Sequence, residues 1–123
     1  MTRGEQFVQS LPGKTRFYDR NERRSYALTR AVAARLIDDP TLVREGLAYA
    51  RRYMAADPTR AVHFELWQEL LRRDVEEIVR SLLDDTPRGA LLRDTQPVFV
   101  VLPDDVRLKI IAAERGGPVT AST

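Results

Sequence analysis

His63 is the residue best suited to acid–base chemistry near neutral pH, and it is the one histidine of the chain. A catalytic histidine needs a nucleophile or an orienting carboxylate, and a metal site needs further ligands at a regular spacing. No such partner is apparent around His63 in the sequence. His63 precedes Trp67 by four residues, which is about one helical turn. We therefore interpret His63 as a helix-surface or packing residue.

Three pairs of adjacent aspartates could supply a carboxylate cluster for Mg²⁺. These pairs are Asp38–Asp39, Asp84–Asp85 and Asp104–Asp105. Each pair lies near a predicted helix start, where an aspartate caps backbone N–H groups and complements the helix dipole. The chain has no cysteine, no glycine-rich phosphate loop and none of the common catalytic motifs. We predict capping roles, no metal site, no cofactor and no enzymatic activity; an enzyme built on His63 and an aspartate pair is the alternative.

Positive charge is concentrated near the N-terminus, where residues 1–30 carry seven basic and three acidic side chains. Arginines are interleaved there with Phe17 and Tyr18. Arginine can contact phosphates and aromatic rings can stack on bases, so this segment is a candidate for contact with DNA or RNA. The candidate residues are Lys14, Arg16, Arg20, Arg23 and Arg24. A solvated leader whose aromatic rings dock on the protein body is the alternative.

The periodicity of apolar residues predicts an all-α fold, a compact bundle of about five to six short helices. Helices are expected over about residues 21–37, 40–54, 58–73 and 74–84, then from Pro87, and over about 104–115. Asp39 suits the N-cap of the second helix, with Pro40 as its first residue. A D-x-x-E arrangement at Asp74 favours two helices over one continuous helix. We expect one helical domain over residues 21–116, a basic arm over 1–20 and a flexible tail over 117–123.

The composition is that of a globular domain, with 43% hydrophobic and 31% charged residues in a chain of 123. No apolar stretch reaches the roughly 18 residues that a membrane span requires. The N-terminus lacks the continuous apolar core of a signal peptide. We therefore expect a cytoplasmic protein with no membrane contact.

The segment from Gln96 to Pro103 is the one clearly β-prone run, with Val98, Val100 and Val101 between two prolines. No second strong strand is visible, and a lone strand leaves its backbone hydrogen bonds unmet. The run could pair with the N-terminal arm, pair with another chain, or lie extended and buried. An extended apolar segment without an internal partner can also bind another protein, so this run is a candidate binding surface.

Three segments resemble small helical antitoxins of bacterial toxin–antitoxin modules. They are Leu28–Leu36 with the following Asp39 and Pro40, then Trp67–Leu71, and then Leu92 and Arg93 leading into Pro97–Leu102. The resemblance covers roughly residues 26–111. It implies a protein that binds and neutralises a cognate toxin by direct contact, with autoregulation of its operon as a further implied role.

The surface that would contact the toxin is inferred from expected exposure and not from the family. The predicted residues are Arg93, Val98, Phe99, Val100 and Arg107, with the N-terminal arm as a second element. The mechanism would be occlusion of the toxin's active site or stabilisation of an inactive arrangement. The alternative function is a nucleic-acid-binding subunit of a ribonucleoprotein or defence complex. The sequence leaves the identity of the partner and the oligomeric state open.

Overall fold

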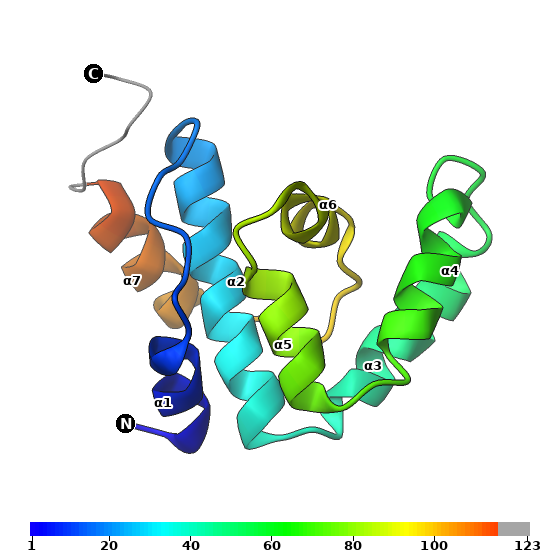
Figure 1. Ribbon diagram of the computed structural model, residues 1–123, viewed down its shortest axis with the longest axis horizontal. Helices are drawn as coiled ribbons and strands as arrows, with labels where there is room; N and C mark the ends of the chain where they lie inside the picture. The colour runs from blue at the N-terminus through cyan, green and yellow to red at the C-terminus, as the bar shows by residue number, and fades with distance from the viewer. Residues whose placement is uncertain (116–123) are drawn as a thin grey trace.

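Seven α-helices and one π-helical turn make up most of residues 1–115, the part of the chain that the computed structural model describes (Figure 1). They are α1 (Arg3–Ser10), α2 (Arg20–Asp38), α3 (Leu42–Tyr49), the turn η1 (Ala50–Met54), α4 (Ala61–Leu70), α5 (Val75–Leu83), α6 (Pro87–Thr95) and α7 (Asp104–Arg115). Residues 1–115 contain no strand, which confirms the all-α prediction. The helix count exceeds the predicted five to six because α1 forms within the expected arm. The predicted tail lies outside the described residues.

A capping box begins α1. The Thr2 hydroxyl accepts a hydrogen bond from the Glu5 N–H at 3.0 Å, and the Glu5 carboxylate accepts one from the Thr2 N–H at 3.3 Å. The helix buries Val8 and lies against α2, where the Gly4 N–H donates to the Asp38 carboxylate at 2.7 Å. Within the segment expected as an arm, residues 1–20, α1 is thus a helix that packs on α2.

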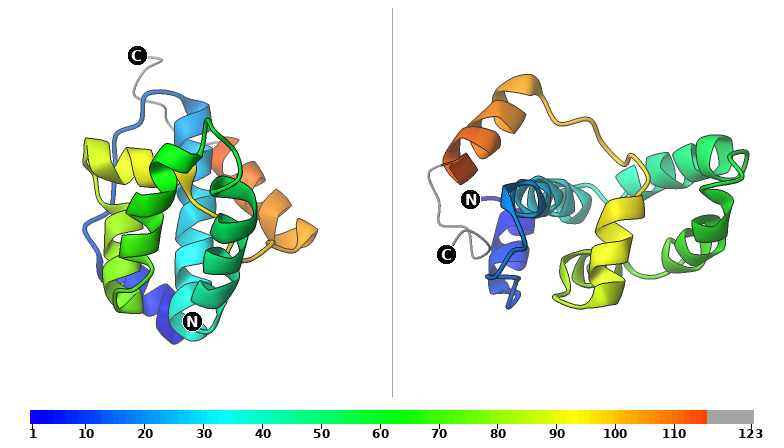
Figure 2. Two further views of the ribbon diagram at one scale, coloured as in Figure 1. Left: turned by 90° about the vertical axis from the view of Figure 1, so that its right-hand side faces the viewer. Right: turned by 90° about the horizontal axis from the view of Figure 1, so that it is seen from above.

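α2 is the central helix, and the other elements are arranged around it. Seen from above, α1 and α7 lie toward one side of α2, while α5, α6 and the α3–α4 pair lie toward the other (Figure 2). Asp19 starts α2 by accepting a hydrogen bond from the Glu22 N–H at 2.8 Å, close to the predicted start. α2 spans 19 residues, yet neither it nor any other described helix is long and apolar enough to cross a membrane.

Trp67 is one of the largest side chains of the hydrophobic core. It is fully buried, and its indole N–H donates to the Thr95 hydroxyl at 3.0 Å, so burial leaves no polar atom of the ring unmet. Phe99 meets the Trp67 ring edge-on, with 6.0 Å between the centroids. The other large side chains that are fully buried are Leu36, Met54, Ile78, Leu82, Leu92, Val79 and Pro97. Helices α2, η1, α4, α5 and α6 all contribute to this core.

The predicted helix boundaries hold where a side chain caps the helix. Asp74 caps α5 by accepting from the Glu76 N–H, which confirms two helices in place of one. Thr86 caps α6 with Pro87 as the first residue. At α3 the predicted N-cap is wrong, because Asp39 accepts instead from the N–H and hydroxyl of Thr41. The resulting turn delays the α-helix by about two residues.

The β-prone run, residues 96–103, is an extended crossover between α6 and α7 and not a strand. Pro97, Phe99 and Leu102 are buried, whereas Val98 and Val101 face solvent. The inward side chains thus correspond to the third alternative for this run, an extended segment packed on the helices. The tight fit depends on Gly46 of α3, where a Cβ atom would stand 2.2 Å from the Phe99 ring.

We expect Gly4→Ala to lower the free energy of unfolding by about 1–3 kcal/mol, because the added methyl group overpacks the α1–α2 contact. A Cβ atom at Gly4 would stand 1.9 Å from the Ala34 carbonyl oxygen, which is backbone and cannot rotate away. Urea unfolding followed by Trp67 fluorescence measures the change, and Gln6→Ala in the exposed part of α1 is the control. Helix propensity alone predicts the opposite sign, a gain of up to about 1 kcal/mol, and such a gain would contradict the expectation.

Candidate interaction surfaces

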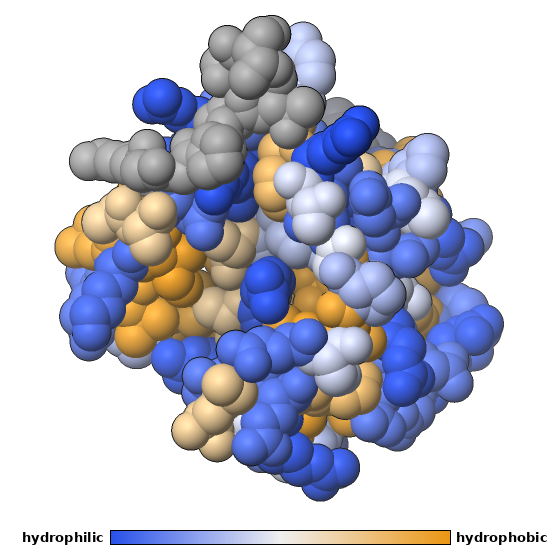
Figure 3. Space-filling view, turned by 60° about the vertical axis from the view of Figure 1, so that its left-hand side comes forward, coloured by the Kyte–Doolittle hydropathy of each residue, from blue (hydrophilic) through white to orange (hydrophobic). Residues whose placement is uncertain are grey.

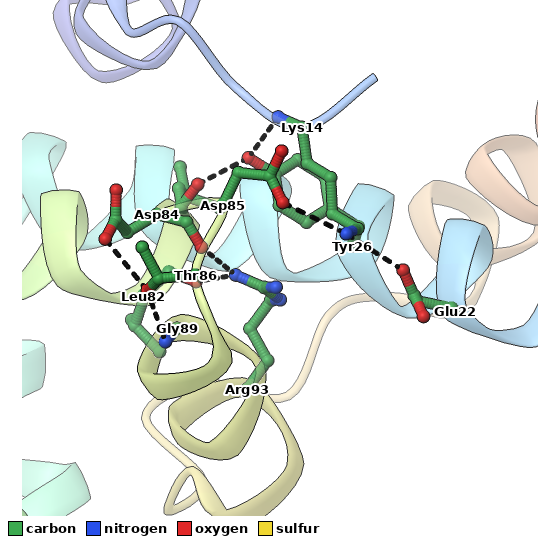
Figure 4. A network of polar contacts seen from close by, with 10 residues as sticks. Lys14, Glu22, Tyr26, Leu82, Asp84, Asp85, Thr86, Gly89 and Arg93 are labelled. Carbon is green, nitrogen blue, oxygen red and sulfur yellow. Dashed lines mark hydrogen bonds and ion pairs between the residues drawn. The ribbon is translucent and has the colours of Figure 1, made fainter. Parts of the chain in front are cut away.

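The C-terminus of α5 is held by side chains from two other helices (Figure 4). The last carbonyl groups of a helix have no partner within the helix. The Arg93 guanidinium of α6 donates to the carbonyl oxygens of Leu82 and Asp84, both at 2.9 Å. The Tyr26 hydroxyl of α2 donates to the Leu83 carbonyl at 2.7 Å. The positive charge of Arg93 also lies at the negative end of the α5 dipole.

Lys14, in the connection between α1 and α2, makes further contacts beside the C-terminus of α5. Its backbone N–H donates to the Tyr26 hydroxyl at 3.0 Å, and its ammonium lies 3.1 Å from Asp85 and 3.3 Å from Glu22. The hydrogen bond to Asp85, aided by Glu22, raises the pKa of the Lys14 ammonium against the opposing effect of burial. Arg93 lies over the Tyr26 ring, 4.9 Å from its centroid. Lys14 and Arg93 thus have structural partners in this conformation.

The residues predicted to bind a partner divide into two groups. Arg93 and Phe99 are buried, with 7% and 3% of their surface exposed, because one caps α5 and the other packs on Trp67. Val98 and Arg107 are exposed and Val100 is half-buried. Val98, Val100 and Arg107 are therefore accessible to a partner protein, whereas Arg93 and Phe99 are in the interior.

Two further exposed apolar residues adjoin the accessible group along the chain. Val101 is 81% exposed and Leu108, on α7, is 58% exposed. The sequence analysis missed both; at Val101 strict alternation from Phe99 would place the side chain on the buried face, but the buried position shifts to Leu102. We call the residues Val98, Val100, Val101, Arg107 and Leu108 the 98–108 surface.

The predicted nucleic-acid residues also divide. Lys14 and Arg23 are engaged in ion pairs, the latter with Glu114 of α7 at 2.5 Å. Arg16, Arg20 and Arg24 are exposed. The two aromatic residues of this segment behave differently as well: the Phe17 ring packs on Tyr26 at 5.6 Å between centroids, whereas Tyr18 is 77% exposed.

The acidic pairs serve local structure, although not always as predicted. Only Asp104 and Asp105 lie in the first turn of a helix. Asp38 ends α2 and binds the Gly4 N–H, and Asp84 accepts from the Thr86 hydroxyl at 2.9 Å. Among residues 1–115 no group of three or more histidine, cysteine, aspartate or glutamate side chains could hold a metal ion. His63 is half-buried on α4.

A groove runs between α1, α2 and α7, with a volume of about 620 Å³. Ala27, Ala31 and Ala34 of α2 line it, together with apolar side chains of the two flanking helices, chiefly Val106 and Ile110 of α7. Figure 3 turns this side of the molecule forward and shows an apolar area bordered by charged side chains. The sequence analysis did not predict the groove, because it forms where α7 meets α1 and α2, which are distant from it in the sequence.

The hairpin of α3, η1 and α4 presents an aromatic pair. The Ala55 N–H donates to the Ala50 carbonyl at 3.0 Å, the five-residue spacing of a π-helical turn. Beside this turn the rings of Tyr49 and Tyr53 lie 4.9 Å apart, and the Arg60 guanidinium lies 5.6 Å from the Tyr49 centroid. The two tyrosine rings therefore contact each other, and Arg60 lies over Tyr49, within the hairpin.

Comparison of the chain with models of protein families, with curated proteins and with solved structures finds no match.

We expect Arg93→Met to lower the free energy of unfolding by about 2–4 kcal/mol, because it removes the donor of the buried Leu82 carbonyl and of the partly buried Asp84 carbonyl. Arg93→Lys should recover part of the loss, since an ammonium can reach one carbonyl. Urea unfolding measures both variants, with Arg88→Met on the exposed side of α6 as the matched control. Equal stability of Arg93→Met and Arg88→Met would show that the α5 C-terminus does not depend on this side chain.

Proposed function

We propose that this protein is a protein-binding partner of the antitoxin type, which neutralises a cognate toxin by direct contact through the 98–108 surface. The single observation that supports this function most is the exposure of Val98, Val101 and Leu108 along one continuous stretch of chain. Exposed apolar side chains cost little singly, but several on one segment are typical of a surface that another protein covers. The antitoxin class itself comes from the sequence resemblance.

The extended backbone of residues 97–102 suits such a contact. Pro97, Phe99 and Leu102 anchor it in the core, so the outward side chains are held on a fixed scaffold and lose little conformational entropy on binding. The apolar side chains of the 98–108 surface would supply buried area, and Arg107, paired with Asp104 at 3.2 Å, would lie at the polar rim. A partner covered in this way is neutralised by occlusion, which requires no reactive group on this chain.

The test is co-expression with the product of the reading frame next to the gene. We expect that product to inhibit growth and the wild-type chain to relieve the inhibition. The double variant Val101→Asp/Leu108→Asp should fail to relieve it and should lose at least about 100-fold in affinity for the purified partner, because two carboxylates would be buried in an apolar contact.

Val62→Asp is the matched control, because Val62 is 71% exposed on α4 and is not part of the 98–108 surface. All variants should keep the wild-type melting temperature, since the replaced side chains are exposed. The proposal fails if the adjacent product is harmless, or if the double variant protects as well as Val62→Asp does.

A second candidate function is nucleic-acid binding through residues 16–24, as a subunit of a ribonucleoprotein or defence complex. The observation that favours it is the exposure of Arg16, Arg20 and Arg24 around the exposed ring of Tyr18. Three guanidinium groups can contact successive phosphates while the tyrosine stacks on a base.

Fluorescence anisotropy with a labelled single-stranded RNA tests this candidate. If residues 16–24 bind it, the affinity falls steeply between about 0.05 and about 0.2 M salt, because counterions are released from the phosphates. The variant Arg16→Gln/Arg20→Gln/Arg24→Gln should lose most of the binding. Replacement of the exposed Arg44, Arg51 and Arg88 by glutamine is the control of equal charge. Equal losses in the two triple variants would contradict a specific role for residues 16–24.

A further inference from the structure

We infer that the groove between α1, α2 and α7 binds an acidic amphipathic helix of a partner protein. The inference rests on the proposed function only in so far as the partner is a protein, and it concerns a site separate from the 98–108 surface. It follows from three properties of the groove: its floor, its walls and the pairing of its charges.

The floor of the groove admits a helix at close range. Ala27, Ala31 and Ala34 are spaced four and three residues apart, so they share one face of α2. Small side chains let a neighbouring helix approach closely, and α1 already uses this property where Gly4 touches the Ala34 backbone. A helix placed beside α1 on the same face would meet a continuous apolar floor.

The walls are apolar and incompletely covered. Val106 and Ile110 of α7 both line the groove, and both are only partly buried. Val8 of α1 lies at the opposite wall. α7 thus has apolar surface on its groove side that no described residue covers fully. A volume of about 620 Å³ is within the usual range of binding pockets, roughly 300–1,000 Å³.

The charges around the groove favour an acidic occupant. Its three carboxylates are compensated locally: Glu5 and Asp38 accept from backbone N–H groups at the positive N-terminal end of α1, and Glu114 pairs with Arg23. Within residues 1–115, by contrast, no carboxylate lies within ion-pair distance of Arg30 or Arg35.

Both arginines line the groove, and they flank the alanine stripe on α2. Guanidinium groups on either side of an apolar stripe match a helix with a central apolar face and carboxylates at its edges. The guanidinium groups of Arg30 and Arg35 are therefore available to carboxylates of an occupant, whereas the carboxylates of the groove already have partners.

The experiment uses the full chain and two labelled peptides of about 16 residues, a length at which an isolated helix becomes marginally stable. One peptide carries leucines at helical spacing and glutamates at the flanking positions; the other has a lysine in place of every glutamate. By fluorescence anisotropy we expect the acidic peptide to bind at least about tenfold more tightly, with a preference that shrinks between about 0.05 and about 0.5 M salt.

Two variants locate the binding. Arg30→Glu/Arg35→Glu should reverse the preference, whereas the control Arg44→Glu/Arg88→Glu makes the same change of net charge outside the groove and should not. Ala113→Trp places a bulky side chain at an exposed position of the groove and should weaken both peptides without loss of stability.

Failure of both peptides to bind, equal affinity for the two, or equal effects of the two charge reversals would overturn the inference. None of these results bears on the proposed function, since the peptide assay contains no toxin. Conversely, a chain that binds the acidic peptide in the groove but fails to protect cells would keep the inference and remove the proposed function.

Discussion

The last carbonyl groups of α5 are buried at Leu82 and Leu83 and partly buried at Asp84, and side chains of two other helices supply their donors. An unpaired buried carbonyl costs about 1–3 kcal/mol, so leaving the Leu82 and Leu83 carbonyl groups unpaired would remove much of the stability of a small domain. The donors come from Arg93 of α6 and Tyr26 of α2. Tyr26 in turn holds the backbone of Lys14. One helix end thereby fixes the relative positions of α2, α5, α6 and the segment that leads from α1.

The sequence predicts most helices but not the role of Arg93. Helix positions depend on local signals, namely apolar spacing and caps such as Asp74 and Thr86. These signals can be identified in one amino-acid sequence. Arg93 caps α5 because folding brings it to the carbonyl groups of Leu82 and Asp84. No residue pattern near Arg93 in the sequence indicates these partners. The T-x-x-E pattern of Thr2 and Glu5 is a local signal for the start of α1 that the sequence analysis did not use.

The two proposed binding surfaces meet at α7, and each depends on how that helix is held. Residues 96–103 approach it in extended form, with the Gln96 side chain donating to the Thr29 hydroxyl at 3.1 Å. At the other end of α7, Glu114 pairs with Arg23 of α2. Between these two attachments none of the helix's described side chains is fully buried. The groove was beyond sequence analysis for this reason: its shape depends on where two distant attachments place α7, and apolar periodicity carries no such information.

The extended crossover also divides the chain into helices α1 to α6, which are synthesised first, and α7, which is synthesised last, because synthesis proceeds from the N-terminus. The residues of the main core precede residue 96, apart from Pro97, Phe99 and Leu102 of the crossover. Helices α1 to α6 can therefore begin to pack while α7 is still inside the ribosome. During that interval α7 does not yet cover its part of the alanine face of α2. A nascent chain at this stage has the floor of the groove without its α7 wall, so the complete groove exists only after α7 has left the ribosome.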